Sequence, residues 1–256
     1  MQLIINKILY GDDCFKTQQF ITQDSKRPVH YFDQNTDYQR PLMLTIVQLS
    51  ALNDNYIYLL HEPQSQETAV VDPTIAEPIL AFLDAQNWPL TYIFNTHHHW
   101  DHIGGNNELK SHTHCQIISS TVDQQRIPGV DKGVSSADSL FLGHQQIRIL
   151  ETPGHTQGHI SYYAPESHAL FCGDTLFGMG CGRLLEGTAA QLWQSLQKLK
   201  ALPADTRVYC AHEYTQNNGC FALTVEPNNQ PLQIRINQVQ QLRQANLSTV
   251  PSTLAS

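Results

Sequence analysis

The sequence has no long apolar run, no paired cysteines and little positive charge, and each absence excludes a class of protein. No stretch approaches the roughly 18 apolar residues that a membrane span needs. The six cysteines include no CxxC pair, so no disulfide framework is indicated. Lysine and arginine total 15 against 23 acidic residues, and the net charge of -8 argues against nucleic acid or an anionic membrane as a partner.

The N-terminal region also lacks the marks of a secretory signal. Residues 1–14 contain no sustained apolar segment and include Asp12 and Asp13. Together with the cysteine pattern, this predicts a cytoplasmic protein. Residues 1–42 mix polar residues without a clear period, which predicts a poorly ordered N-terminal extension. Nothing in the sequence requires more than a monomer.

From Met43 onward, short strand patterns alternate with helical ones. Apolar and β-branched runs predict strands at residues 43–49, 56–60, 69–72, 90–94, 116–119, 146–151, 160–164, 169–172 and 207–210. Helical spacing predicts helices at residues 76–85, 189–202 and 234–245. Strands arriving in pairs between helices indicate stacked sheets flanked by helices. The strand signal stops after His212, so a small helical C-terminal region is expected.

The strongest local signal is the segment THHHWDH, residues 96–102. Residues i and i+2 of an extended segment point the same way, so His97 and His99 can bind one ion. After the chain turns, Asp101 and His102 are free to reach a second ion. Imidazole and carboxylate ligands suit Zn²⁺, Fe or Mn²⁺. The alternative is a histidine-rich surface loop with adventitious metal affinity, because four ligands cannot close two sites.

Three further ligand-type residues each stand just past the end of a predicted strand. His155 lies in TPGHTQGH, Asp174 follows FCG, and His212 follows YCA. Binding residues collect at strand ends in layered α/β folds, so this repetition favours a built metal centre over a surface loop.

These motifs resemble those of the metallo-β-lactamase superfamily. THHHWDH, TPGHTQGH, FCGDTLF, GCGRLLEGT and HEYT are together similar to the glyoxalase II family, the hydroxyacylglutathione hydrolases, from Met43 to Ala255. The resemblance implies an α/β fold, the αββα four-layer sandwich, over residues 43–213. A helical substrate-binding region would follow over residues 214–256, truncated because family members typically continue some tens of residues further. Since such members usually begin near Met43, we expect Met43 to be the natural start.

The resemblance also implies a ligand assignment. One metal would be bound by His97, His99 and His155, the other by Asp101, His102 and His212, with Asp174 bridging the two. Two cations roughly 3.5 Å apart lower the pKa of a shared water and produce hydroxide at physiological pH. We expect Zn²⁺ at both sites, with Fe or Mn possible. Asp101 and Asp174, with that bridging hydroxide, would be the catalytic residues.

Three more residues are assigned roles by the same resemblance. Asp72 would orient a ligand histidine, although it could instead be a simple strand-end turn former. Arg183 and Tyr214 would contact the glutathione part of the substrate, although Arg183 could be an ordinary surface charge. Leu185 stands where the family usually has an aromatic residue, which puts one contact in doubt.

The other histidines receive no metal role. His159 is interpreted as a structural loop histidine, and His98 as either a neighbour of the ligands or exposed. Six histidines outside any motif are predicted to be surface residues: His30, His61, His112, His114, His144 and His168.

The expected reaction is hydrolysis of S-(2-hydroxyacyl)glutathione, with S-lactoylglutathione as substrate, as in the second step of methylglyoxal detoxification. A thiolate leaving group with a pKa of about 8.5 needs little general-acid help. The alternatives are a persulfide dioxygenase, another hydrolase of the same fold, or a metal-binding remnant with impaired substrate binding. The last is motivated by the missing tail, since lost carboxylate contacts would raise KM.

Overall fold

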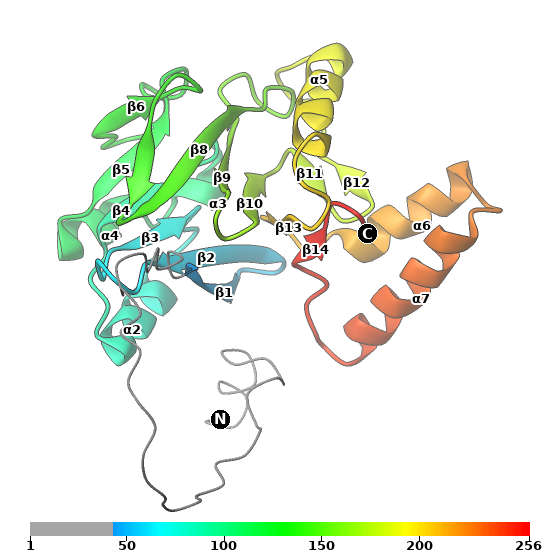
Figure 1. Cartoon of the computed structure of the whole chain (residues 1–256), viewed down its shortest axis with the longest axis horizontal. Helices are drawn as coiled ribbons and strands as arrows, with labels where there is room; N and C mark the ends of the chain where they lie inside the picture. Colours follow the sequence, from blue (N-terminus) through cyan, green and yellow to red (C-terminus); the bar gives the residue numbers. More distant parts are fainter. Residues whose placement is uncertain (1–42) are drawn as a thin grey trace, which may run out of the picture. The chain divides into compact units, whose positions relative to one another are not determined.

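Two six-stranded sheets dominate the computed structural model, which describes residues 43–256 (Figure 1). The predicted extension at residues 1–42 lies outside the described residues. The first sheet has its strands in sequence order: β1 (Thr45–Ala51), β2 (Asn55–His61), β3 (Thr68–Val71), β4 (Tyr92–Phe94), β5 (Gln116–Ser120) and β6 (Lys132–Val134). Its first three strands are antiparallel neighbours, and β3 to β6 run parallel.

The second sheet has the order β14-β13-β10-β9-β8-β7. Its strands are β7 (Leu140–Leu142), β8 (Gln145–Glu151), β9 (Ile160–Ala164), β10 (Ala169–Gly173), β13 (Arg207–Cys210) and β14 (Ser252–Thr253). Only β10 and β13 pair in parallel. A small separate hairpin is formed by β11 (Leu176–Phe177) and β12 (Gly180–Cys181).

Alternation along β2 shows how the layers arise. Tyr58 and Leu60 belong to the buried cluster between the two sheets, whereas Ile57 and Leu59 belong to the cluster under the helices. That outer cluster includes side chains of α2 (Glu77–Gln86) and α4 (Asn106–Thr113). On the second sheet's side, the buried Leu199 of α5 (Ala189–Lys200) belongs to the same apolar cluster as that sheet's side chains. The predicted αββα sandwich is confirmed.

A pair of helices follows β13. The sequence predicts a helical C-terminal region, but the first helix of the pair escapes prediction. α6 (Thr215–Val225) packs against α7 (Gln230–Gln244), and Figure 1 shows the two side by side. The start of α6 reads TQNNGC, with no apolar period. Its Gly219 lies against Ile236 and Met179, so a glycine is needed where the helices approach closely. The expectation that strands end at His212 is wrong, since β14 adds a short edge to the second sheet.

Two buried tyrosines join the sheets in opposite directions. The hydroxyl of Tyr58, from the first sheet, donates to the carbonyl of Cys210 in the second at 2.5 Å. The hydroxyl of Tyr162, from the second sheet, donates to the carbonyl of Asn95 just after β4, at 3.0 Å. Asn95 and Cys210 each lie two residues before a predicted metal ligand. These bonds therefore fix the separation of the strand ends from which the ligands extend.

We expect Tyr162→Phe to lower the free energy of unfolding by about 1 to 3 kcal/mol, because it leaves a buried carbonyl without its donor. Urea unfolding at a fixed metal concentration would measure this. Tyr163→Phe is the matched control, because in the described part of the chain its hydroxyl has no hydrogen bond. Equal midpoints for the two variants would contradict the prediction.

Candidate metal centre

The structure brings all seven predicted ligands together at the ends of strands. His97 and His99 follow β4, and Asp101 and His102 lie in the short helix α3 (Trp100–Ile103). The other three follow the second sheet's strands β8, β10 and β13: His155, Asp174 and His212. Their ligand atoms form three overlapping groups, within each of which all atoms lie within 4.8 Å of one another.

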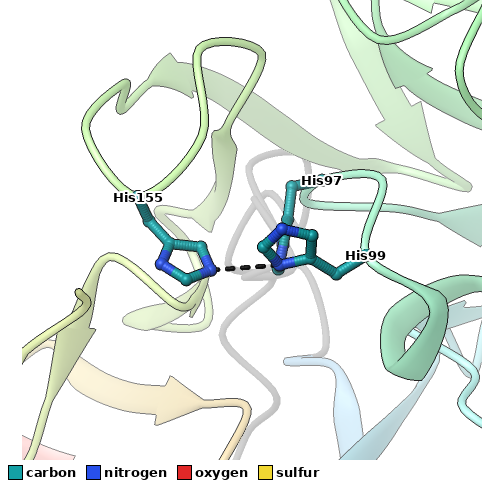
Figure 2. Close-up of side chains that lie close together, drawn as sticks. All are labelled: His97, His99 and His155. Carbon is teal, nitrogen blue, oxygen red and sulfur yellow. Dashed lines mark hydrogen bonds between the residues drawn. The ribbon is translucent and has the colours of Figure 1, made fainter. Parts of the chain in front are cut away.

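The first group is His97, His99 and His155, whose rings converge (Figure 2). His97 Nε2 lies 2.9 Å from His99 Nδ1, and His155 Nε2 lies 3.2 Å from the same atom. His97 is fully buried. Three ring nitrogens facing one point are the donor arrangement that a divalent transition ion requires.

The second group is Asp101, His102 and His212. Asp101 Oδ2 lies 3.7 Å from His102 Nε2 and 3.5 Å from His212 Nε2. Asp174 reaches both groups, with Oδ1 3.6 Å from His102 Nε2 and 3.4 Å from His212 Nε2. Its Oδ2 lies 3.4 Å from His155 Nε2. One carboxylate therefore lies between the two sets of ligands.

A divalent cation fits this donor set. Among the described residues, His102 Nε2 and Asp174 Oδ1 are buried polar atoms with no hydrogen-bond partner. Buried polar atoms are almost always paired, and these two point into the centre. A metal ion would satisfy both, and imidazole with carboxylate is a suitable ligand set for one.

Hydrogen bonds from behind orient most of the rings. His102 Nδ1 lies 2.9 Å from Asp72 Oδ2, and His155 Nδ1 lies 2.8 Å from the carbonyl of Arg183. Asp72 also accepts from the backbone N–H of Thr96 at 2.8 Å and from its hydroxyl at 2.7 Å. Such contacts fix which ring nitrogen would face a metal ion.

Sequence reasoning misses two residues that orient predicted ligands by hydrogen bonds. These are Asp54 and Asn55, in a segment that the sequence indicates to be a turn. Asp54 Oδ1 lies 2.9 Å from His212 Nδ1. Asn55 Nδ2 donates to Asp101 Oδ2 at 3.1 Å. The one feature of the sequence that could have pointed to these two residues is the run of three polar residues, 53–55, between two paired strands. Only the topology shows that this turn meets the end of β13, where Asn55 bridges to His212.

His159 supports Asp174 from inside the fold. Its Nε2 accepts the backbone N–H of Asp174 at 3.1 Å, so the ring proton sits on Nδ1, beside the Thr152 and Thr175 hydroxyls. The ring stacks on His97 with centroids 4.9 Å apart. Burial lowers the pKa of His159 well below its ordinary value, in keeping with a neutral ring.

One of the histidines predicted to lie on the surface is buried. His61 is 4% exposed and stacks on Trp88 with ring centroids 4.0 Å apart, so that prediction is wrong. An alternating strand does not reveal which of its faces is covered by a helix. Four others are exposed as predicted: His112, His114, His144 and His168. His30 lies outside the described residues.

The imidazoles of the predicted ligands differ in pKa. Burial lowers the pKa of His97 well below its ordinary value, and burial with the neighbouring His155 lowers that of His99 to about 4. Burial also acts to lower the pKa of His102, but the carboxylates of Asp72 and Asp174 outweigh it and raise that pKa to about 9.

Tyr214 and Arg183 flank the centre from different elements. The ring of Tyr214 stacks on that of His212, with centroids 4.8 Å apart and planes 5° from parallel. Arg183 is exposed in the loop after β12, and no ion pair to its guanidinium occurs within residues 43–256. A cation and an aromatic ring at the mouth of the centre could contact an anionic peptide-like ligand.

Comparison with known proteins agrees with the fold. Residues 52–212 match the Metallo-beta-lactamase superfamily, and residues 213–256 match the Hydroxyacylglutathione hydrolase C-terminus. The BLEG-1 B3 metallo-beta-lactamase is 26% identical with a TM-score of 0.60, over 66% of this chain and 91% of that one. ETHE1 from Myxococcus xanthus is 31% identical with a TM-score of 0.61, over 66% and 76%. The chain belongs to the metallo-β-lactamase superfamily.

Curated relatives narrow the assignment. Hydroxyacylglutathione hydrolase from Methylococcus capsulatus is 52% identical over 213 residues, 83% of each chain. The protein of that name from Rhodospirillum rubrum is 53% identical over 211 residues, 82% of each. Within the superfamily, this chain is a member of the hydroxyacylglutathione hydrolase, or glyoxalase II, family, which confirms the resemblance. None of the helices in the described part of the chain is long and apolar enough to cross a membrane.

Metal binding at the second group should release a proton near neutral pH. With a pKa of about 9, His102 is protonated in the metal-free protein, and coordination requires its neutral form. Affinity at this group should therefore rise with pH up to that pKa and then level off. His97 and His99 are already neutral and should release none. Calorimetry of zinc binding in buffers of different ionisation enthalpy measures the proton count. If zinc binding releases no proton from His102, the assignment of His102 as a metal ligand is contradicted.

Asp54→Ala should weaken metal binding at the second group about 10- to 100-fold, because His212 loses the partner of its Nδ1. Chelator competition would measure both affinities, and the three-histidine group should be unchanged. Asn53→Ala, one residue earlier in the same turn, is the control. If both variants bind metal like the parent protein, Asp54 does not orient His212.

Proposed function

We propose that this chain hydrolyses S-(2-hydroxyacyl)glutathione, with S-lactoylglutathione as substrate, at a centre of two divalent metal ions. The observation that carries the proposal is Asp174, whose two oxygens face both ligand groups. Membership of the hydroxyacylglutathione hydrolase family supports the choice of substrate. The products would be a 2-hydroxy acid (lactate) and glutathione, as in the second step of methylglyoxal detoxification.

In this proposal His97, His99 and His155 hold one ion, Asp101, His102 and His212 the other, and Asp174 bridges them. Zn²⁺ suits the ligands best, and Fe or Mn²⁺ would also be accepted. A related solved structure, 26% identical with a TM-score of 0.55, is described as a di-iron-bound form.

When bound, such ions supply a water of lowered pKa and a Lewis acid for the thioester carbonyl. The chain's own residues set the geometry of the attack. Asp101 and Asp174 present carboxylate oxygens 3.5 and 3.4 Å from His212 Nε2, where they can orient the attacking water. Asn55 holds Asp101 in place by donating to its Oδ2. No side chain need protonate the leaving group, because a thiolate with a pKa of about 8.5 departs readily.

Arg183 and Tyr214 would bind the glutathione part of the substrate. The Arg183 guanidinium is free to pair with a peptide carboxylate, and Tyr214 presents a ring beside His212. Since His155 Nδ1 donates to the Arg183 carbonyl, the loop that carries the proposed substrate contact is tied to the loop that carries a proposed metal ligand. We further propose a monomeric cytoplasmic enzyme without a nucleic-acid or membrane partner, on the charge and composition of the sequence.

Steady-state assay of the zinc-loaded chain with S-lactoylglutathione tests the proposal, alongside metal analysis. We expect two ions per chain, and a fall in kcat of at least about 100-fold in Asp174→Ala, which removes the shared carboxylate. Arg183→Gln should raise KM with little change in kcat, because it removes a contact made equally in the bound substrate and the transition state.

The alternative activities give different results in the same measurements. A single tightly held iron with oxidation of glutathione persulfide would identify a persulfide dioxygenase. Equal, poor rates on S-lactoylglutathione and an unrelated small thioester would mean that glutathione recognition is lost. No rate on either substrate would leave a metal-binding remnant.

A further inference from the structure

Four charged or titratable side chains form a cluster beside the three-histidine group, and none of them is a predicted metal ligand: His98, Asp123, Arg126 and Glu186. We call this cluster the Arg126 clamp. Arg126 donates to Glu186 in a two-pronged pair, at 3.0 Å from Nη1 to Oε2 and 2.5 Å from Nη2 to Oε1. Arg126 Nη1 also donates to Oδ1 of the fully buried Asp123 at 3.4 Å.

The clamp fixes His98, which lies between two predicted ligands in the sequence. A guanidinium can only donate, so His98 Nε2 accepts from Arg126 Nη2 at 2.6 Å. The ring proton is then on Nδ1 and is donated to Asp123 Oδ2 at 3.2 Å. His98 is thus held from both sides. Because it lies between His97 and His99, holding it restrains the segment that carries both ligands.

The other end of the clamp joins two loops. The carboxylate of Glu186 accepts the backbone N–H of Gln157 at 2.9 Å, and its backbone carbonyl accepts from Gln157 Nε2 at 2.9 Å. The backbone N–H groups of Leu185 and Glu186 donate to the carbonyl of His155 at 3.3 and 3.2 Å. The loop that bears Arg183 therefore lies against the loop that bears His155.

We propose that the Arg126 clamp sets the geometry of the three-histidine group and of the Arg183 loop together, with Arg126 and Glu186 as positioning residues. All three ligands of that group lie in the two segments that the clamp ties together. The second group has its own supports, Asp54, Asn55 and Asp72. The part of the proposal that concerns Arg183 rests on the proposed function, whereas the part that concerns the histidines does not.

The ion pair between Arg126 and Glu186 is partly exposed to solvent, so a role in positioning can be distinguished from a role in stability. The side chains of Arg126 and Glu186 are 41% and 26% exposed. Ion pairs this exposed contribute little to the free energy of unfolding. Removing the pair should therefore change local geometry without changing global stability by a comparable amount.

The test uses the full chain with Arg126→Gln, with Glu186→Gln, and with both changes. At saturating zinc, each single variant should raise KM for S-lactoylglutathione at least about five-fold while kcat changes less than about two-fold. Chelator competition should show that one of the two zinc affinities falls about ten-fold and the other stays unchanged. The double variant should be no worse than either single variant, because the two residues act as one unit.

Lys110→Gln is the matched control. Lys110 lies in α4, outside the Arg126 clamp, and this substitution removes its ion pair with Asp131. The N–O distance of that pair is 2.6 Å, and the two side chains are 34% and 36% exposed. Arg126→Lys keeps the charge but loses the planar fork, so its KM should lie between those of the parent chain and Arg126→Gln.

The proposal is overturned if KM and both zinc affinities of Glu186→Gln stay within about two-fold of those of the Lys110→Gln control. It is also overturned if the urea midpoint falls and both zinc affinities fall together, since that marks a structural role only. If the parent chain itself does not cleave the thioester, the proposed function fails. The selective loss of one zinc affinity then still decides whether the clamp positions the histidines.

Discussion

The carboxylate of Asp174 lies between imidazoles from three separate segments, with its oxygens 3.4 to 3.6 Å from the nitrogens of His102, His155 and His212. One short side chain can reach three rings only if the strand ends that carry them are held a few ångströms apart. Gly173, directly before it, makes this approach possible. Its φ of +47° favours glycine, and a Cβ there would collide with the hydroxyl of Thr96. The end of β10 therefore lies directly against the segment that begins the THHHWDH motif.

The same constraint explains several buried polar groups in the core. Tyr58 and Tyr162 join the sheets just before His212 and His97, and His159 holds the backbone of Asp174 itself. Each is a hydrogen bond to a main-chain group at a strand end. Apolar packing alone would tolerate small shifts of one sheet over the other. Directional bonds at the strand ends limit those shifts where the ligand geometry depends on them.

Much of the fold, and the residues that gather as candidate metal ligands, can be predicted from the sequence, because local patterns carry both. The strand at residues 160–164 and that at 207–210 have the predicted bounds, since alternation and flanking turns define them. The ligands stand just past strand ends, which is also a local signal. α6 is missed because its sequence has no apolar period, and it forms a helix through its close packing on α7. Helix propensity does not predict a helix whose stability comes from packing against another segment of the chain.

The residues that orient the predicted ligands are harder to predict from the sequence, because their partners are also distant in the chain. Asp54 and Asn55 look like turn formers, and Arg126 and Glu186 look like surface charges, because each meets its partner across 46 to 158 residues of chain. The two ligand groups also differ in how they are held. Carboxylates support His102 and His212 directly, whereas a backbone carbonyl supports His155. A carbonyl lends a ring less negative charge than a carboxylate does, so the three-histidine group depends more on the placement of its loops. The ion pair between Arg126 and Glu186 lies where those loops meet.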